Sequence, residues 1–199
     1  MAVAAALLIA WGGDYQPNLL GHAVAWWHAV HADHAYGWFL ATIFLHAGPG
    51  HLLANLTALL AASSAVEFLC GGPWAIAVYL ATGLGAAWAS YAGHAAPPLS
   101  VGASGAIFGL LGCTVSFLLR RRRAFNYAQQ WKVWRVYVPM FILLYLPVLA
   151  NADVHAHAGG FLCGLVLGVW LPPHPRIAAL AAVDPLKDDD VGDEPDGPA

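Results

Sequence analysis

The chain has 199 residues, of which 60% are hydrophobic and only 10% are charged, and its formal net charge is -3. An ordinary soluble domain carries about 25% charged residues and cannot bury so much apolar surface at this size. These values exclude an ordinary water-soluble domain, a disordered chain and a nucleic-acid-binding protein, which needs a basic face. The mean hydropathy of +0.63 indicates a polytopic membrane protein instead.

The first 37 residues divide into a short apolar run and a stretch rich in Trp and His. Met1–Trp11 would span about 16 Å as a helix, whereas the hydrocarbon core of a bilayer is about 30 Å thick. We therefore expect a short or truncated N-terminal helix, which lacks the basic region and cleavage site of a signal peptide. Residues 12–37 have the amphipathic character of an interfacial outer loop.

Five apolar runs in the rest of the sequence are long enough to cross a bilayer, and Gly, Pro or Arg clusters separate them. Pro139 and Pro147 predict a kink in the fourth run, because proline removes a backbone hydrogen bond. The predicted fold is therefore an all-α polytopic membrane helical bundle with five full transmembrane helices and a short N-terminal helix. The five runs are Gly50–Leu69, Trp74–Tyr91, Gly102–Leu119, Trp131–Ala150 and Val154–Leu171.

The positive charge of the chain is concentrated at one place. No Lys or Arg precedes Arg120, which begins a row of four arginines that ends at Arg123. Cytoplasmic loops collect Lys and Arg, so the end of the third helix is expected to be cytoplasmic. By alternation, the first, third and fifth helices enter from the outer side, and residues 172–199 form an acidic, disordered cytoplasmic tail. The cysteines have no paired spacing and are predicted to be packing residues; they are Cys70, Cys113 and Cys163.

Three sets of polar residues lie at the start of the three helices that enter from the outer side: His46 with His51 and Asn55, then Ser104, then His157. A single serine in a membrane helix usually bonds to a carbonyl one turn earlier, and a single histidine is more often a packing residue than a catalyst. Polar groups within membrane spans are nevertheless costly. Three sets at one depth therefore predict a functional site.

Glycines give a geometric reason for two of these sets to meet. They recur at spacings of three and four residues on the third and fifth helices, and such stripes allow two membrane helices to approach closely. Packing of these two helices is expected to bring the Ser104 hydroxyl within reach of the His157 imidazole. The glycines are Gly102, Gly105, Gly109 and Gly112 on the third helix, and Gly160, Gly164 and Gly168 on the fifth.

These residues resemble the motifs of rhomboid intramembrane serine proteases. The matching segments are His46-Ala-Gly-Pro-Gly-His51-Leu-Leu-Ala-Asn55, Gly102-Ala-Ser104-Gly and His157-Ala-Gly-Gly160-Phe-Leu-Cys-Gly164, in the family's order. The resemblance covers about Phe39 to Leu171, and a protease core of residues 38–171 is expected. It implies a serine endopeptidase, a hydrolase, that cleaves the transmembrane segments of membrane proteins with a Ser-His dyad.

The resemblance also implies a role for each residue. Ser104 would be the nucleophile and His157 its general base, because a serine hydroxyl is a poor nucleophile until a base takes its proton. His51 and Asn55 would meet the oxyanion beside Gly102. Structural roles are implied for His46, Glu67, Gly105, Gly160 and Gly164, and the kinked fourth helix would be the side gate. Substrates would have helix-destabilising segments within the bilayer, and neither a cofactor nor a metal is implied.

Two features depart from the family pattern. Relatives usually have a full first helix, of which Met1–Ala10 would be only a part. Many relatives also carry a Trp-Arg pair in the outer loop, where this chain has Gly37-Trp38. Neither departure involves the expected dyad.

Two alternative functions remain open at this stage. The first is a non-catalytic rhomboid-like protein that binds membrane clients. The second is a histidine-based metal site in a transporter or hydrolase, although no His-Glu-x-x-His motif is present and Ser104 would have no role. Its ligands would come from His46, His51, Asp153, His155 and His157. The short loops and the Ala/Gly/Trp-rich composition favour a bacterial inner membrane protein, and the sequence gives no oligomeric state.

Overall fold

A computed structural model describes residues 30, 34, 36–46, 48–94, 101–121, 134–135 and 153–182. Every regular element in these ranges is an α-helix, which confirms the all-α helical bundle. The expected N-terminal helix and nearly all of the kinked fourth helix lie outside the described residues, as does most of the acidic tail. The described helices are α3 (Trp38–Thr42), α4 (Pro49–Cys70), α5 (Gly72–Gly93), α6 (Ser104–Arg120), α8 (Val154–Trp170) and α9 (Pro175–Ala182).

The long helices match four of the five predicted spans to within two residues at each end. One shift of boundary matters for the site, because α6 begins at Ser104 and not at Gly102. Gly102 has a φ of 127°, a conformation that helical residues do not adopt and that glycine tolerates best. Gly102 is therefore a loop residue that redirects the chain just before the helix.

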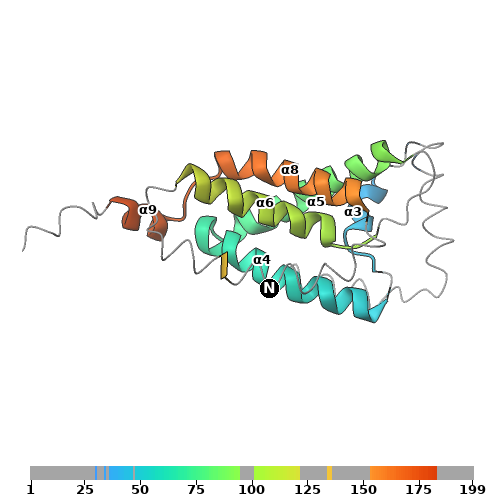
Figure 1. Ribbon diagram of the computed structural model, residues 1–199, viewed down its shortest axis with the longest axis horizontal. Coiled ribbons are helices and arrows are strands. Elements are labelled where there is room, and N and C mark those ends of the chain that lie inside the picture. Colours follow the sequence, from blue (N-terminus) through green and yellow to red (C-terminus); the bar gives the residue numbers. More distant parts are fainter. Residues whose placement is uncertain are drawn as a thin grey trace, which may run out of the picture.

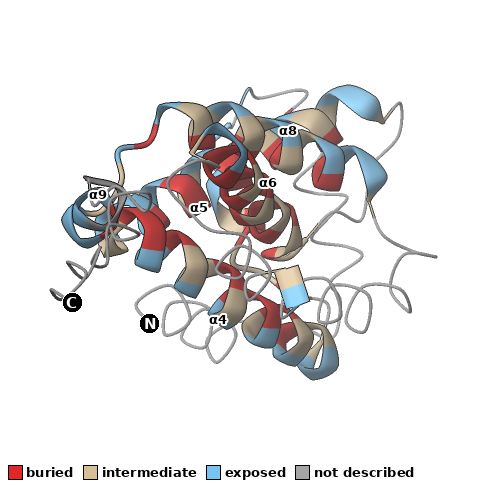
Figure 2. Cartoon of the chain, turned by 60° about the vertical axis from the view of Figure 1, so that its left-hand side comes forward, coloured by how far each residue is buried: buried red, intermediate tan, exposed pale blue. Residues whose placement is uncertain are grey.

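Among the described residues, four long helices pack together, and α6 and α8 run side by side (Figure 1). α5 packs against both of them, while α4 contacts α5 and α6 on another side. The buried residues gather where α5 and α6 face their neighbours, and the outward faces of the helices are exposed (Figure 2). The large buried side chains at this centre are Tyr79, Leu110 and Phe117.

The expected glycine contact between α6 and α8 is present. An added Cβ at Gly160 would collide with the carbonyl of Gly105, one at Gly164 with the carbonyl of Gly109, and one at Gly168 with the carbonyl of Cys113. The two helices therefore meet backbone to backbone along three turns. Small residues permit such an approach, which gains dispersion contacts over the whole interface.

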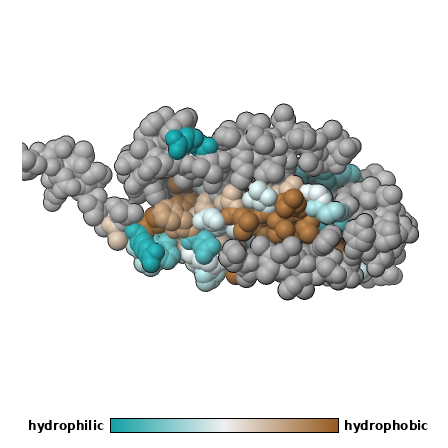
Figure 3. Space-filling model, turned by 90° about the horizontal axis from the view of Figure 1, so that it is seen from below, coloured by the Kyte–Doolittle hydropathy of each residue, from teal (hydrophilic) through white to brown (hydrophobic). Residues whose placement is uncertain are grey.

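The outer surface of the bundle is apolar. α4 and α5 are each 22 residues long and apolar enough to cross a membrane, while α6 and α8 are shorter apolar helices of 17 residues. Figure 3 shows a face whose described residues are hydrophobic along the middle, with strongly hydrophilic residues toward the left-hand end. Trp74 and Trp170 are exposed at one end of the bundle, and Trp38 and Trp88 near the other. Tryptophans at both ends are typical of the two membrane interfaces.

The first two arginines of the row cap the end of α8. Arg120 Nη1 donates to the carbonyl of Val169 at 2.8 Å, and Arg121 Nη2 donates to the carbonyl of Leu171 at 2.6 Å. Basic side chains can satisfy the carbonyls at a helix C-terminus that lack a partner within the helix. The ends of α6 and α8 are therefore fixed at one level.

The start of the tail differs from the prediction of a disordered segment beginning at residue 172. Pro172 and Pro173 end α8 as expected, but Pro175–Ala182 then form α9. Pro175 suits the first turn of a helix, and the alanines that follow favour helix. The side chain of Ile177 is 2% exposed, and the N–H of His174 donates to the carbonyl of Leu69 at the end of α4. This docking supplies the tertiary contact that a short helix needs, which composition alone did not reveal.

Candidate functional site

Ser104 and His157 meet at the starts of α6 and α8. Ser104 is the first residue of α6 and His157 lies in the first turn of α8. Ser104 Oγ lies 2.8 Å from His157 Nε2, within hydrogen-bond distance, although 53 positions separate them in the sequence. Ser104 is partly exposed and His157 is buried, with 8% of its surface exposed. The arrangement suits transfer of the hydroxyl proton to the imidazole.

The imidazole of His157 is held by an aromatic ring. Phe108 stacks on it with ring centroids 4.3 Å apart and an interplanar angle of 10°. Phe108 lies four residues after Ser104, so the two side chains lie on the same face of α6. The carbonyl of Asp153 accepts the His157 backbone N–H, and the Asp153 carboxylate caps α8 by accepting the Ala156 N–H. These contacts fix both the ring and the helical turn that carries it.

The side chains of His51 and Asn55 both lie close to Gly102, on the side where another residue would carry a Cβ. A Cβ at Gly102 would lie 2.8 Å from His51 Cε1 and 3.2 Å from Asn55 Nδ2. The Asn55 side chain is 2% exposed, and its Nδ2 is buried with no hydrogen-bond partner in the described part of the chain. Buried amide groups are nearly always hydrogen-bonded, so an orphan donor calls for an explanation. An anionic oxygen bound beside Gly102 would provide the missing acceptor.

The segment before Ser104 is bonded to the chain at the end of α3. The Gly102 N–H donates to the carbonyl of Thr42 at the end of α3, at 2.9 Å. The next residue, Ile43, accepts the hydroxyl of Tyr79 through its carbonyl at 3.1 Å, which links the loop to α5. These two bonds set the position of the Gly102 backbone relative to the rest of the bundle.

His46 lies in the loop before α4 and packs against His51, with ring centroids 5.3 Å apart. Its Nδ1–H donates to the carbonyl of Phe44 at 3.0 Å, so the ring braces the loop. Burial, together with the neighbouring His51, lowers the pKa of His46 to about 4. His46 is therefore neutral at physiological pH, and its structural role stays a prediction.

The two helices that carry the pair are shorter than their neighbours. At 17 residues, α6 and α8 span about 26 Å, whereas the 22 residues of α4 span about 33 Å. The arginine caps hold α6 and α8 together at their far ends, and His174 bonds to the end of α4. Ser104 is partly exposed at the start of the shorter helix α6, so both water and a substrate can reach its hydroxyl.

The chain is similar in sequence to known proteins of one family. The model of the rhomboid domain family matches residues 32–174. The chain belongs to the rhomboid family. It is 36% identical to RHOMBOID-like protein 2 of Arabidopsis thaliana over 155 residues, which are 77% of this chain and 48% of that protein. It is 34% identical to RHOMBOID-like protein 5 of the same plant, over 69% of this chain and 44% of the relative.

One bacterial relative is named as a rhomboid protease. The chain is 34% identical to Rhomboid protease GluP of Bacillus subtilis over 131 residues, which are 64% of this chain and 24% of that protein. The chain thus spans between a quarter and a half of the length of these relatives. Rhomboid proteins are integral membrane proteins, as the apolar composition predicted. The relatives come from a plant and a bacterium, so a bacterial inner membrane location stays a prediction.

The other rhomboid-like residues named from the sequence have definite places. Gly105, Gly160 and Gly164 lie in the backbone contact between α6 and α8. Glu67 is exposed in the last turn of α4, close to Gly72 at the start of α5. The role that the resemblance implies for Glu67, which is to connect the ends of neighbouring helices, stays a prediction.

The expected metal ligands do not form one group. His46 packs on His51, while His157 pairs with Ser104. Asp153 and His155 instead meet His94 at the end of α5. Sequence reasoning did not single out His94, because only the packing of α5 on α8 reveals its neighbours. Phe108 was also missed, although its spacing of four residues from Ser104 was a usable signal.

Proposed function

We propose that this chain is an intramembrane serine endopeptidase that uses Ser104 as nucleophile and His157 as general base. The observation that supports it best is the distance of 2.8 Å between Ser104 Oγ and His157 Nε2, in a chain that belongs to the rhomboid family. The buried amide of Asn55 beside Gly102 supports the same proposal independently.

The mechanism follows from these positions. Ser104 Oγ attacks the carbonyl carbon of the scissile peptide bond while His157 Nε2 accepts the hydroxyl proton. The oxyanion that forms is stabilised by the Ser104 backbone N–H and by the side chains of His51 and Asn55. The first N–H groups of a helix have no partner within it, so the start of α6 favours negative charge there.

The second half of the reaction uses the same groups. The His157 imidazolium returns its proton to the leaving amine, which breaks the peptide bond and leaves an acyl ester on Ser104. Water then attacks the ester carbonyl and gives a proton to His157 Nε2, and the imidazolium returns that proton to Ser104 Oγ as the ester bond breaks and the carboxylic acid product leaves. Phe108 keeps the ring in place through both proton transfers, because it stacks on one face of the imidazole. The stack takes the orienting role that a carboxylate has in a catalytic triad.

The substrates are membrane proteins whose spanning segment has helix-destabilising residues, since a peptide must be extended before Ser104 can reach its carbonyl. In the proposed orientation Ser104 and His157 lie toward the outer side, and the arginine row and residues 172–199 face the cytoplasm. A non-catalytic client-binding protein would share the fold. It would not need a buried amide without a hydrogen-bond partner, as at Asn55, near a serine that is hydrogen-bonded to a histidine.

A fluorophosphonate probe tests the nucleophile directly. Purified full-length protein in detergent is expected to be labelled, and Ser104→Ala is expected to lose the label completely. Ser116→Ala is the matched control, because Ser116 is a buried serine on the same helix that bonds to the Cys113 carbonyl. Cleavage of a transmembrane substrate that survives Ser104→Ala would reject the mechanism, and equal loss of label in Ser116→Ala would reject the assignment of Ser104.

A further inference from the structure

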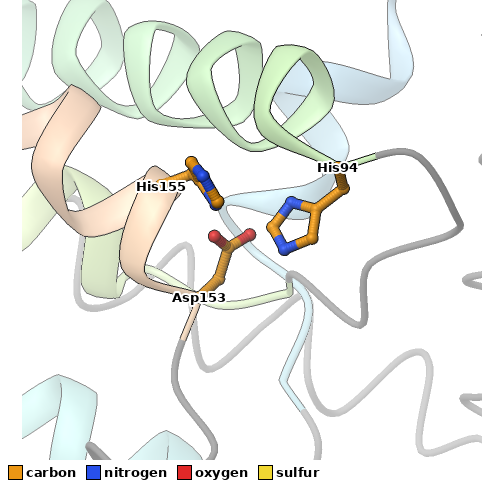
Figure 4. A group of neighbouring side chains, drawn as sticks. All are labelled: His94, Asp153 and His155. Carbon is orange, nitrogen blue, oxygen red and sulfur yellow. The ribbon is translucent and has the colours of Figure 1, made fainter.

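A second group of polar side chains lies at the same end of the bundle as Ser104 and His157. It consists of His94 after the end of α5, Asp153 before α8 and His155 in the first turn of α8. Their candidate ligand atoms all lie within 4.8 Å of one another. The three side chains point toward one another, with the Asp153 carboxylate between the two rings (Figure 4). None of these three side chains takes part in the proposed proton transfers, although the Asp153 carboxylate also caps the helix that carries His157.

The ring of His94 is held in one tautomer. Its Nδ1–H donates to the carbonyl of Ser90 at 2.8 Å, since a carbonyl oxygen can only accept. Nδ1 then carries the proton and Nε2 has a free electron pair. Metal-binding histidines almost always donate their other ring N–H to a carbonyl or carboxylate in this manner. His94 therefore has the supporting bond of a metal ligand.

The carboxylate of Asp153 is held in a similar way. The Ser90 hydroxyl donates to Oδ2, and the Ala156 N–H donates to Oδ1 at 3.0 Å. Each carboxylate oxygen has two lone pairs, so an oxygen that accepts one of these hydrogen bonds can also bind a cation. Ser90 thus supports two ligands at once, through its carbonyl to His94 and its hydroxyl to Asp153.

Gly93 makes room for the ring of His155. A Cβ at Gly93 would collide with His155 Cδ2 and lie 2.9 Å from its Nε2, so only glycine lets this ring lie against the end of α5. The His94 and His155 ring centroids are 4.8 Å apart with an interplanar angle of 73°. His155 is exposed, and His94 and Asp153 are only partly buried, so all three side chains are accessible to solvent. An ion can therefore enter from water.

We propose that His94, Asp153 and His155 form a binding site for a divalent transition-metal ion of the Zn²⁺ type. Two imidazoles and one carboxylate suit Zn²⁺, which accepts three protein ligands with water in the remaining position. With ligand bonds of about 2.0–2.2 Å, a tetrahedral ion holds its ligand atoms roughly 3.4 Å apart. The three groups must therefore close by somewhat more than 1 Å, which rotation of the exposed His155 ring can supply.

The bound ion would join the end of α5 to the start of α8, one turn before His157. It would therefore stabilise the folded bundle by binding the native state only. The site does not depend on the proposed peptidase activity, and it can be tested in protein that lacks Ser104.

Calorimetric titration of chelator-treated, full-length Ser104→Ala protein with ZnCl₂ tests the site. This protein is expected to bind one Zn²⁺ more than the same protein carrying His94→Gln or His155→Gln. Each of these changes should weaken that binding step at least about 100-fold, because even the loss of a partner of a ligand costs about 10–100-fold. Gly93→Ala, which displaces the His155 ring without removing a ligand, should weaken it about 10-fold. Mg²⁺ should give no corresponding step, since it prefers oxygen ligands.

The matched control is His174→Gln, because His174 is a partly exposed histidine at the opposite end of α8. It should leave the binding step unchanged. Unchanged binding in both His94→Gln and His155→Gln would overturn the proposal, and so would equal weakening by His174→Gln. If the ligand variants fail to fold, X-ray absorption at the zinc edge of Ser104→Ala protein decides instead. Two imidazoles and oxygen ligands on the ion support the site, and fewer than two imidazoles overturn it.

Discussion

Replacing Gly160 with alanine is expected to separate the proposed catalytic pair without removing a catalytic group. Gly160 lies one turn after His157 and faces Gly105, the residue that follows Ser104. The new methyl carbon would lie 2.9 Å from the Gly105 carbonyl carbon and closer still to its oxygen. Carbon atoms pack best at about 3.5–4.0 Å, so α8 must retreat from α6 by about 1 Å at this turn.

This displacement of α8 is large compared with the range of distances over which Ser104 and His157 can form a hydrogen bond. It would lengthen the distance of 2.8 Å between Ser104 Oγ and His157 Nε2 to about 3.8 Å, beyond hydrogen-bond range. A misplacement of about 1 Å typically costs about 100-fold in rate. We therefore expect turnover to fall about 100-fold, which corresponds to about 2.7 kcal/mol in the activation free energy.

The measurement is the initial rate of cleavage of a fluorogenic transmembrane substrate by purified protein in detergent. Gly37→Ala is the matched control, because Gly37 has open space around it and a φ of -56° that alanine adopts freely. It should keep the wild-type rate, and circular dichroism should show intact helix in both variants. A Gly160→Ala rate within threefold of wild type would refute the claim that backbone contact sets the dyad distance.

Two further predictions concern the residues around the pair. Asn55→Ala should lower kcat by about 10²–10³, because an oxyanion donor is lost, and should leave KM nearly unchanged; an equal effect on KM and kcat would contradict this role. His46 has a pKa depressed to about 4 by burial, so the unfolded chain takes up a proton before the folded one does. The contribution of His46 to the free energy of unfolding should therefore be constant well above pH 6.5 and fall by about 3 kcal/mol as the pH decreases to 4. In His46→Gln, melting temperatures measured over this range should change less.

Much of the site could be predicted from the sequence because its geometry depends on glycine spacing. The glycines at positions 105, 160 and 164 predicted a close approach of two helices, and the structure has that approach. The starts of both helices follow from breakers and apolar runs, so Ser104 and His157 could be placed at one depth. Backbone contact leaves few alternative arrangements, which is why pattern alone was informative here.

Other features depended on tertiary contacts that spacing does not encode. The positive φ of Gly102 shortens α6 by two residues from the predicted start, and no local pattern distinguished it from the helical glycines. His94 lies about sixty positions before Asp153 and joins it only through the packing of α5 on α8. α9 forms because Ile177 finds a buried position, which composition could not show.

The bonds from Arg120 and Arg121 to the last carbonyls of α8 bear on how the chain enters the membrane. If α8 were inserted in the opposite direction, these carbonyls would lie in the opposite leaflet, and their bonds to Arg120 and Arg121 could not form. Hydrogen bonds to charged groups are worth about 1.5–3 kcal/mol each, so this topological error would cost about 3–6 kcal/mol. In the proposed orientation, the two arginines at the cytoplasmic end of α6 would thereby also favour the correct insertion of α8.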